Sequence, residues 1–126
     1  MIVKIIILAI LITVPSFSVH AADICTTVVS TGTIDGETWT LDNSPYCISG
    51  NLTISNLNIY AGVEVLFLDN YQFYVEPDGV LSINGINGST VKFRGHEING
   101  NGWQGISLDN ASSSSKIDYC EVSGAN

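Results

Sequence analysis

Basic residues are scarce in this sequence. Four Lys and Arg side chains stand against twelve Asp and Glu in 126 residues, for a formal net charge of −8. Because such a surface repels phosphate groups, we expect neither nucleic acid nor anionic lipid headgroups as partners. An acidic surface of this kind is typical of exported β-proteins, in which charge maintains solubility and keeps strand edges apart.

Histidine is scarcer still, with only His20 and His96 in the chain. A hydrolase triad needs a histidine beside its nucleophile, and a histidine-rich metal site needs several. Lys92, Arg94 and His96 alternate and could share one outward strand face, as a β-elimination site would require. Solvated charge beside a turn explains them better, so we expect no catalytic residue here.

Metal-binding motifs are also lacking. The sequence contains neither an EF-hand loop nor a repeated Gly-Gly-x-Gly-x-Asp unit. Four acidic residues in expected loops leave calcium as a lesser alternative: Asp69, Glu76, Asp78 and Asp109. We predict no metal and no cofactor.

Long apolar runs are absent except at the amino terminus. Lys4 precedes the apolar residues 5–14, and small residues follow in Val19-His20-Ala21 and His20-Ala21-Ala22. This order predicts a cleaved signal peptide over residues 1–22, with either triplet as the cleavage site. An uncleaved anchor would need about 18 to 20 uninterrupted apolar residues, and Thr13 and Pro15 interrupt this run. We therefore expect a secreted or cell-surface protein, with the periplasm as an alternative and no membrane insertion after cleavage.

Helical periodicity is missing from the rest of the chain, which consists of short alternating segments closed by Gly, Asn or Asp. Alternation predicts an inward set of side chains: Val63, Val65, Phe67, Phe73, Val75, Leu81, Ile83, Val91, Phe93, Ile106 and Leu108. It places Leu66, Leu68 and Tyr74 on the outer face. There they are either scattered exposed residues or a patch covered by an amino-terminal segment or a partner.

Two all-β architectures fit this alternation of short strands and tight corners. Corner residues such as Asp78-Gly79 and Asn84-Gly85 suit the bends of a parallel β-helix. The same dipeptides also form hairpin turns, so an antiparallel β-sandwich is the alternative. Periodicity does not separate the two.

An ordered set of segments carries a family resemblance. They are residues 44–54, 62–67, 73–75, 79–85, 91–93, 103–106 and 115–119, which include G-V-x-V-x-F and W-x-G-I patterns. Together they resemble the start of exported bacterial right-handed parallel β-helix repeat proteins, the pectin-lyase-like superfamily. The resemblance implies a solenoid of about three to four turns over residues 45–126. No catalytic motif of that family can be transferred to this sequence.

The two ends of this solenoid are expected to differ. Residues 23–44 predict an amino-terminal cap, with Trp39 as a lid on the apolar core. The sequence stops directly after a strand-like segment without a cap, so we expect the coils to continue in a longer protein. An uncapped last turn also predicts self-association through the carboxyl-terminal end.

Three cysteines are present, and in an oxidising compartment two of them can pair. Cys25 starts the expected cap and Cys47 the first coil, so their location favours a structural disulfide between these two. Cys120 is then left over, and we expect it to be buried as a small hydrophobic residue rather than to be reactive.

Two functions remain. The residues present favour a secreted or cell-surface scaffold, a structural, adhesion or glycan-binding module without catalysis of its own. The alternative is the amino-terminal fragment of a polysaccharide lyase or glycoside hydrolase whose active site lies beyond Asn126.

Overall fold

The computed structural model describes residues 23–126 and shows an all-β chain in two parallel sheets. The first sheet, sheet A, contains β1 (Thr27–Val29), β3 (Tyr46–Ile48), β5 (Glu64–Phe67), β7 (Val91–Gly95) and β10 (Cys120–Val122). The second, sheet B, contains β2 (Gly32–Trp39), β4 (Leu52–Tyr60), β6 (Phe73–Asn84), β8 (Ile106–Leu108) and β9 (Lys116–Asp118). One 3₁₀ turn, η2 (Leu41–Asn43), follows β2. No helix in this part of the chain is long and apolar enough to cross a membrane.

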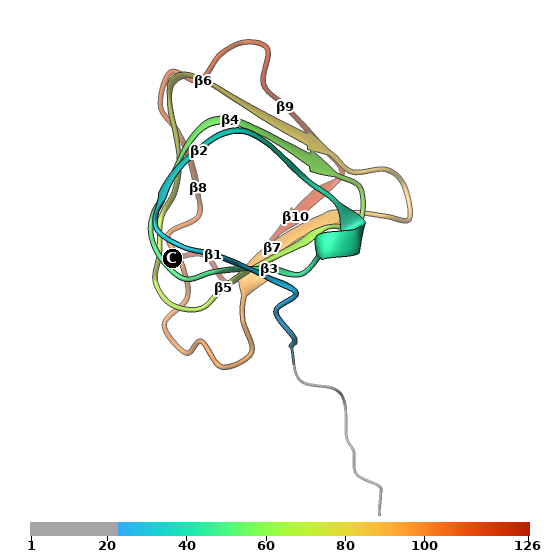
Figure 1. The fold of residues 1–126 in the computed structure, drawn as a ribbon, viewed down its shortest axis with the longest axis vertical. Helices are drawn as coiled ribbons and strands as arrows, with labels where there is room; N and C mark the ends of the chain where they lie inside the picture. The colour runs from blue at the N-terminus through green and yellow to red at the C-terminus, as the bar shows by residue number, and fades with distance from the viewer. Residues whose placement is uncertain (1–22) are drawn as a thin grey trace, which may run out of the picture.

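The chain alternates between the two sheets as it advances. In Figure 1, β2, β4 and β6 follow nearly the same path, and β1, β3, β5, β7 and β10 overlie one another on the opposite side. Every ladder between these strands is parallel, so the antiparallel sandwich considered from turn chemistry is wrong. The Asn84-Gly85 corner leads from β6 in sheet B toward β7 in sheet A. Asn87-Gly88, in contrast, closes a two-residue turn between Ile86 and Ser89, which form an isolated antiparallel bridge.

Sheet B is bent along its length. The register of β4 on β6 jumps between Ile54 and Asn56, where β6 carries additional residues around Asp78. The φ angle of Asp78 is 64°, a left-handed conformation that Asp tolerates better than most residues. Before this jump, β8 pairs with the first half of β6, and after it β9 pairs with the second half.

The apolar core lies between the sheets. Each inward side chain lies directly over its partner in the previous strand, as Tyr46, Val65 and Phe93 do in sheet A. Phe67 stacks on Trp103 with ring centroids 4.1 Å apart, and Trp39 stacks on Tyr46 at 4.6 Å near the amino-terminal end. Core burial in these strands agrees with their alternation, because a period of two places alternate side chains on one face of the sheet.

Two residues depart from the expected pattern. Leu66 was expected outside, yet it is fully buried, because the chain before β1 covers this part of sheet A. Leu108 was expected inside and does lie in register with Val75, but half of its surface is exposed. No later coil among the described residues covers it.

Candidate functional site

An amino-terminal strap, residues 23–26, lies on the outer face of sheet A. Thr26 and Thr27 donate their backbone N–H groups to Pro45 O at 3.1 and 3.2 Å. The sulfurs of Cys25 and Cys47 are bonded at 2.00 Å. The strap is therefore held against β3 by one covalent bond and by backbone hydrogen bonds, as the location of these two cysteines predicts.

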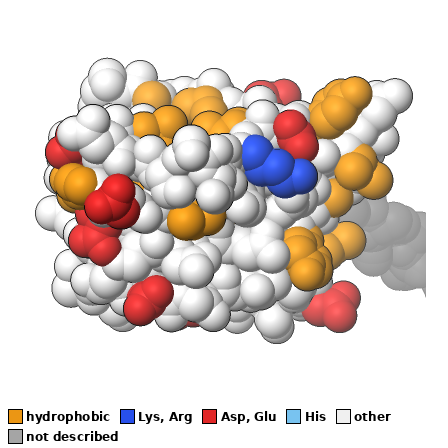
Figure 2. Space-filling view, turned by 90° about the horizontal axis from the view of Figure 1, so that it is seen from above, with side chains coloured by type: hydrophobic (Ala, Val, Ile, Leu, Met, Phe, Trp, Pro, Cys, Tyr) orange, Lys and Arg blue, Asp and Glu red, His pale blue; other side chains and the backbone are white. Residues whose placement is uncertain are grey.

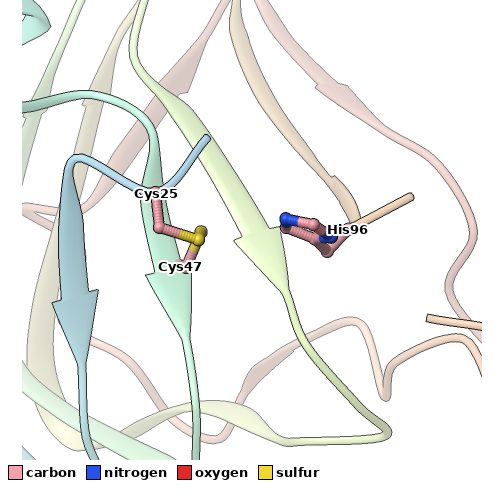
Figure 3. A group of neighbouring side chains, drawn as sticks. All are labelled: Cys25, Cys47 and His96. Carbon is pink, nitrogen blue, oxygen red and sulfur yellow. A yellow bond between two sulfur atoms is a disulfide. The ribbon is translucent and has the colours of Figure 1, made fainter. Parts of the chain in front are cut away.

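His96 lies beside this disulfide. Figure 3 shows its imidazole ring directed toward the two cysteines from the segment that follows β7. The ligand atoms of Cys25, Cys47 and His96 all lie within 4.8 Å of one another, but the disulfide already uses both sulfurs. His96 is only 7% exposed, and its Nδ1 accepts the Ile98 N–H at 3.3 Å. A covered imidazole in this position packs under the strap and has little access to an extended substrate.

An ionic cluster closes the far end of the strap. Arg94 donates from both terminal nitrogens to the carboxylate of Asp23, at 3.0 and 2.9 Å. Glu97 donates its backbone N–H to the same carboxylate at 2.9 Å. The hydrogen bonds from Arg94, followed by the Glu97 N–H and the charges of Arg94 and His96, lower the pKa of Asp23 to about 2 against an opposing effect of burial. Asp23 in turn raises the pKa of Arg94.

Lys92 and Arg94 in β7 and His96 directly after it do not form one outward site. Lys92 points to solvent, Arg94 is paired with Asp23, and His96 is covered. A β-elimination site needs a basic group that reaches the sugar, and the strap occupies two of the three candidates. Arg94 therefore holds the strap through Asp23, and His96 lies covered beside the disulfide.

The four acidic residues considered for calcium do not gather. Glu76 accepts from the Ser55 hydroxyl, Asp109 accepts from the Tyr74 hydroxyl at 3.1 Å, and Asp69 accepts from Asn101 at 2.9 Å. Among residues 23–126, Cys25, Cys47 and His96 are the only cluster of three or more candidate metal ligands. Each of these acids therefore stabilises its own corner.

An open hollow of about 620 Å³ lies beside a ladder of alternating charge. Glu64, Lys92 and Glu121 stand in register on β5, β7 and β10, and all three line the hollow. Pro45 and the Gly88–Thr90 loop form other parts of its wall. Figure 2 shows a face on which acidic side chains are scattered among neutral ones and basic side chains form a single small patch.

Three apolar residues in the last described strands are half exposed. Leu108, Ile117 and Val122 occupy inward register positions over Val75, Ile83 and Phe93. They are 50%, 45% and 48% exposed, whereas their three partners are fully buried. An apolar layer half exposed in this way can be covered by another coil or by another molecule.

Sequence reasoning missed the Asp23 cluster and the role of Trp103. Asp23 and Arg94 are 71 residues apart, and no local pattern links them. Trp103 is fully buried and donates its indole N–H to Ser123 O at 2.8 Å, which ties the last coil to the core. The small residues around it, in Gly102-Trp103-Gln104-Gly105, were the available signal for a tight turn that inserts a ring. Residues 1–22, which carry the predicted signal peptide, lie outside the described residues.

No protein-family profile, no curated protein sequence and no solved structure matches this chain.

Proposed function

We propose that this protein is an exported right-handed parallel β-helix scaffold, a structural, adhesion or glycan-binding module that associates through its carboxyl-terminal coil and has no catalysis of its own. Its family is the pectin-lyase-like superfamily. The signal-like amino terminus supports export, and the disulfide between Cys25 and Cys47 suits an oxidising compartment.

The pairing of β6 supports the solenoid. Its first half pairs with β8 and its second half with β9, so that sheet B has two segments to each turn of chain. With the strand in sheet A, each turn then contributes three short parallel segments, as the resemblance implies. Crossovers between parallel strands of one sheet are right-handed in nearly all proteins, which favours the right-handed coil.

The proposed association through the carboxyl-terminal coil rests on one observation: the inward-facing apolar residues of this coil are half exposed. Leu108, Ile117 and Val122 continue ladders that are fully buried one strand earlier. Strands β8 and β10 also stand last in their sheets among the described residues, with one edge each that no strand pairs. A second copy placed there would cover the apolar layer and pair the free edges at the same time.

Sedimentation velocity over a range of concentrations tests this association. Residues 23–126 are expected to form a larger species as concentration rises, and Val122→Lys should abolish it by placing a charge in the apolar layer. Val28→Lys is the matched control, because Val28 is 59% exposed but lies in β1 at the other end of sheet A. A monomer at every concentration, or equal loss in both variants, would contradict the proposal.

The hollow beside Glu64, Lys92 and Glu121 supports the glycan-binding part. Its polar side chains can hydrogen-bond sugar hydroxyls, and the excess of acid disfavours polyanionic chains, so a neutral glycan fits better. An array of neutral and uronic-acid glycans should retain the protein on neutral members only. Glu121→Ala should reduce that retention while Asp42→Ala, outside the hollow, should not. If Glu121→Ala and Asp42→Ala are retained equally, the glycan binds outside the hollow.

A further inference from the structure

Asn-Gly dipeptides recur in the corners of this chain. They are Asn84-Gly85, Asn87-Gly88, Asn99-Gly100 and Asn101-Gly102. Asparagine is chemically labile before glycine, because no Cβ shields the glycine nitrogen from the carbon of the preceding side-chain amide. The two groups react only where they can meet, so the surroundings of each dipeptide decide its reactivity. The first three share the local sequence Ile-Asn-Gly, which makes them a matched set.

The Asn84-Gly85 corner is fixed at both reacting groups. Asn84 is partly buried, and its Nδ2 donates to Asn58 Oδ1 at 2.6 Å. Gly85 is buried, and its backbone N–H donates to Asp118 O at 3.0 Å. A reaction between these two groups would have to break both hydrogen bonds first.

The side-chain amides of Asn99 and Asn101 are also held. Asn99 Nδ2 donates to the carbonyl oxygens of Phe67 and Gly102 at 2.9 and 2.8 Å. Asn101 Nδ2 donates to Asp69 Oδ1 at 2.9 Å. Each side chain has to give up these hydrogen bonds before its amide carbon can turn toward the next backbone nitrogen.

Asn87-Gly88 differs, because it lies at the tip of the turn between Ile86 and Ser89. Hydrogen bonds hold only the two ends of this turn: Ile86 N donates to Ser89 O at 3.3 Å, and Ser89 N donates to Ile86 O at 2.9 Å. Asn87 and Gly88 are exposed, and within residues 23–126 neither the Asn87 side chain nor the Gly88 N–H has a hydrogen-bond partner. The space around Gly88 is open as well, since a Cβ built there would meet nothing within 4 Å. Both reacting groups are therefore free to approach each other and accessible to water.

We propose that Asn87 deamidates spontaneously through a succinimide formed with Gly88, and that the fold protects the other Asn-Gly corners from the same reaction. Hydroxide takes the proton of the Gly88 nitrogen, which bonds to Asn87 Cγ. The Cγ–Nδ2 bond breaks, and the nitrogen leaves as ammonia with a proton from water, which regenerates the hydroxide. Water then opens the ring, at the α-carbonyl carbon to give isoaspartate or at Cγ to give aspartate. One water is consumed and one ammonia is released, without oxidant, reductant or enzyme.

The modification changes charge and shape beside the hollow. Gly88 lines the hollow together with Glu64 and Glu121, so deamidation adds a carboxylate next to a wall that already contains two. In isoaspartate the Cβ becomes part of the main chain, which lengthens the turn between its hydrogen-bonded ends. Modified and unmodified chains therefore differ in net charge, and anion-exchange chromatography should separate them.

Peptide mapping by mass spectrometry tests the site. Purified protein with its disulfide intact is incubated at mildly alkaline pH, and the replacement of the amide by a hydroxyl is followed at each Asn-Gly. Asn87 should react first, and the other three should be slower by roughly fivefold or more, the effect of breaking at least one hydrogen bond. Faster or equal modification at any of the other three would overturn the proposal.

The urea-unfolded chain provides the reference for the role of the fold. Without the native hydrogen bonds, the three Ile-Asn-Gly sites should deamidate at similar rates. Asn87 should therefore change its rate least on unfolding, whereas Asn84 and Asn99 should accelerate. The same preference for Asn87 in urea would show that the fold does not protect the other sites, and would overturn that part of the proposal.

Two variants test the same site by ammonia release from the folded protein. Asn87→Gln should remove most of the ammonia and the later-eluting acidic species, because a glutamine side chain has to close a larger and less favourable ring. Asn101→Gln, the same change at an exposed Asn-Gly, is the matched control and should leave both nearly unchanged. Equal losses in the two variants would contradict the assignment to Asn87. None of these measurements depends on export, self-association or glycan binding.

Discussion

At the scale of single residues, burial depends on what lies beyond a strand as much as on the direction of its side chains. Leu66 points away from the core and is fully buried, because the strap covers it. Val122 points toward the core and is 48% exposed, because no described coil lies over it. Inward and outward are properties of a strand, whereas buried and exposed are properties of the assembled chain.

Phe67 is expected to be among the most costly side chains to remove. Its ring packs against Trp103, Phe73 and Phe93 in the middle of the core, and it is fully buried. Phe67→Ala should lower the free energy of unfolding by about 3 to 5 kcal/mol, measured by urea denaturation. Val28→Ala, at an exposed site of the same sheet, should cost far less; similar losses would contradict the packing of Phe67.

Cys120 is expected to react slowly with alkylating reagents. Burial raises the pKa of its thiol to about 11, and the charge of Glu121 acts in the same direction. Below that pH the thiolate is a minor species, so labelling by iodoacetamide at pH 8 should be much slower than in the urea-unfolded chain. Glu121→Gln should speed it only slightly, because burial is the larger cause. Equal rates in folded and unfolded protein would refute this.

At the scale of elements, the strap is attached to sheet A by a disulfide and by an ion pair. The disulfide joins it to β3, and the Asp23–Arg94 pair joins it to β7. Between these two contacts, the strap covers Leu66 and His96. Without the strap, an apolar side chain and an imidazole would be exposed on the outer face of sheet A. The two contacts also link β3 and β7, which are separated by β5 in sheet A.

The Asp23–Arg94 ion pair should be lost in acid. The pKa of Asp23 is about 2 in the folded chain, below the ordinary Asp value of 3.8, so the folded state favours the ionised carboxylate. The stability it contributes is complete above pH 3.8 and disappears as the pH falls toward 2. Asp23→Asn should therefore lower the stability of the folded chain at pH 6. It should also reduce the further loss of stability between pH 4 and 2, as followed by thermal unfolding. Asp42→Asn, an exposed acid in η2, is the control; an unchanged acid slope in Asp23→Asn would count against the pairing.

At the scale of the whole molecule, the two ends of the core are unlike. Near the amino-terminal end, Trp39 and Tyr46 stack and are almost fully buried. At the other end of the described chain, β8, β9 and β10 carry half-exposed apolar residues, and no described strand pairs with their outer edges. The association proposed above would cover this half-exposed layer.

Residues 23–126 are expected to release no unsaturated product from polygalacturonate. Arg94 and His96 are held under the strap, which leaves Lys92 as the exposed basic side chain of that strand. Ultraviolet absorbance of unsaturated uronates provides the measurement, with and without added calcium. Product formed by this chain and lost in Lys92→Ala would reverse the conclusion and favour a lyase.

The sequence by itself determined the β-strands, the corners and most of the core, because alternation with a period of two is a local property that each segment carries alone. Val65, Phe73 and Phe93 could be assigned to the interior from their own strands. It did not determine parallel pairing, since Asp-Gly and Asn-Gly corners serve hairpins and coils equally well. Only the tertiary structure decided that choice, together with the strap: Asp23 meets Arg94 and Glu97 across more than 70 residues of chain, where no sequence pattern acts. The burial of Leu66 and the exposure of Leu108 follow from the same cause, because both depend on which segment comes to lie above them.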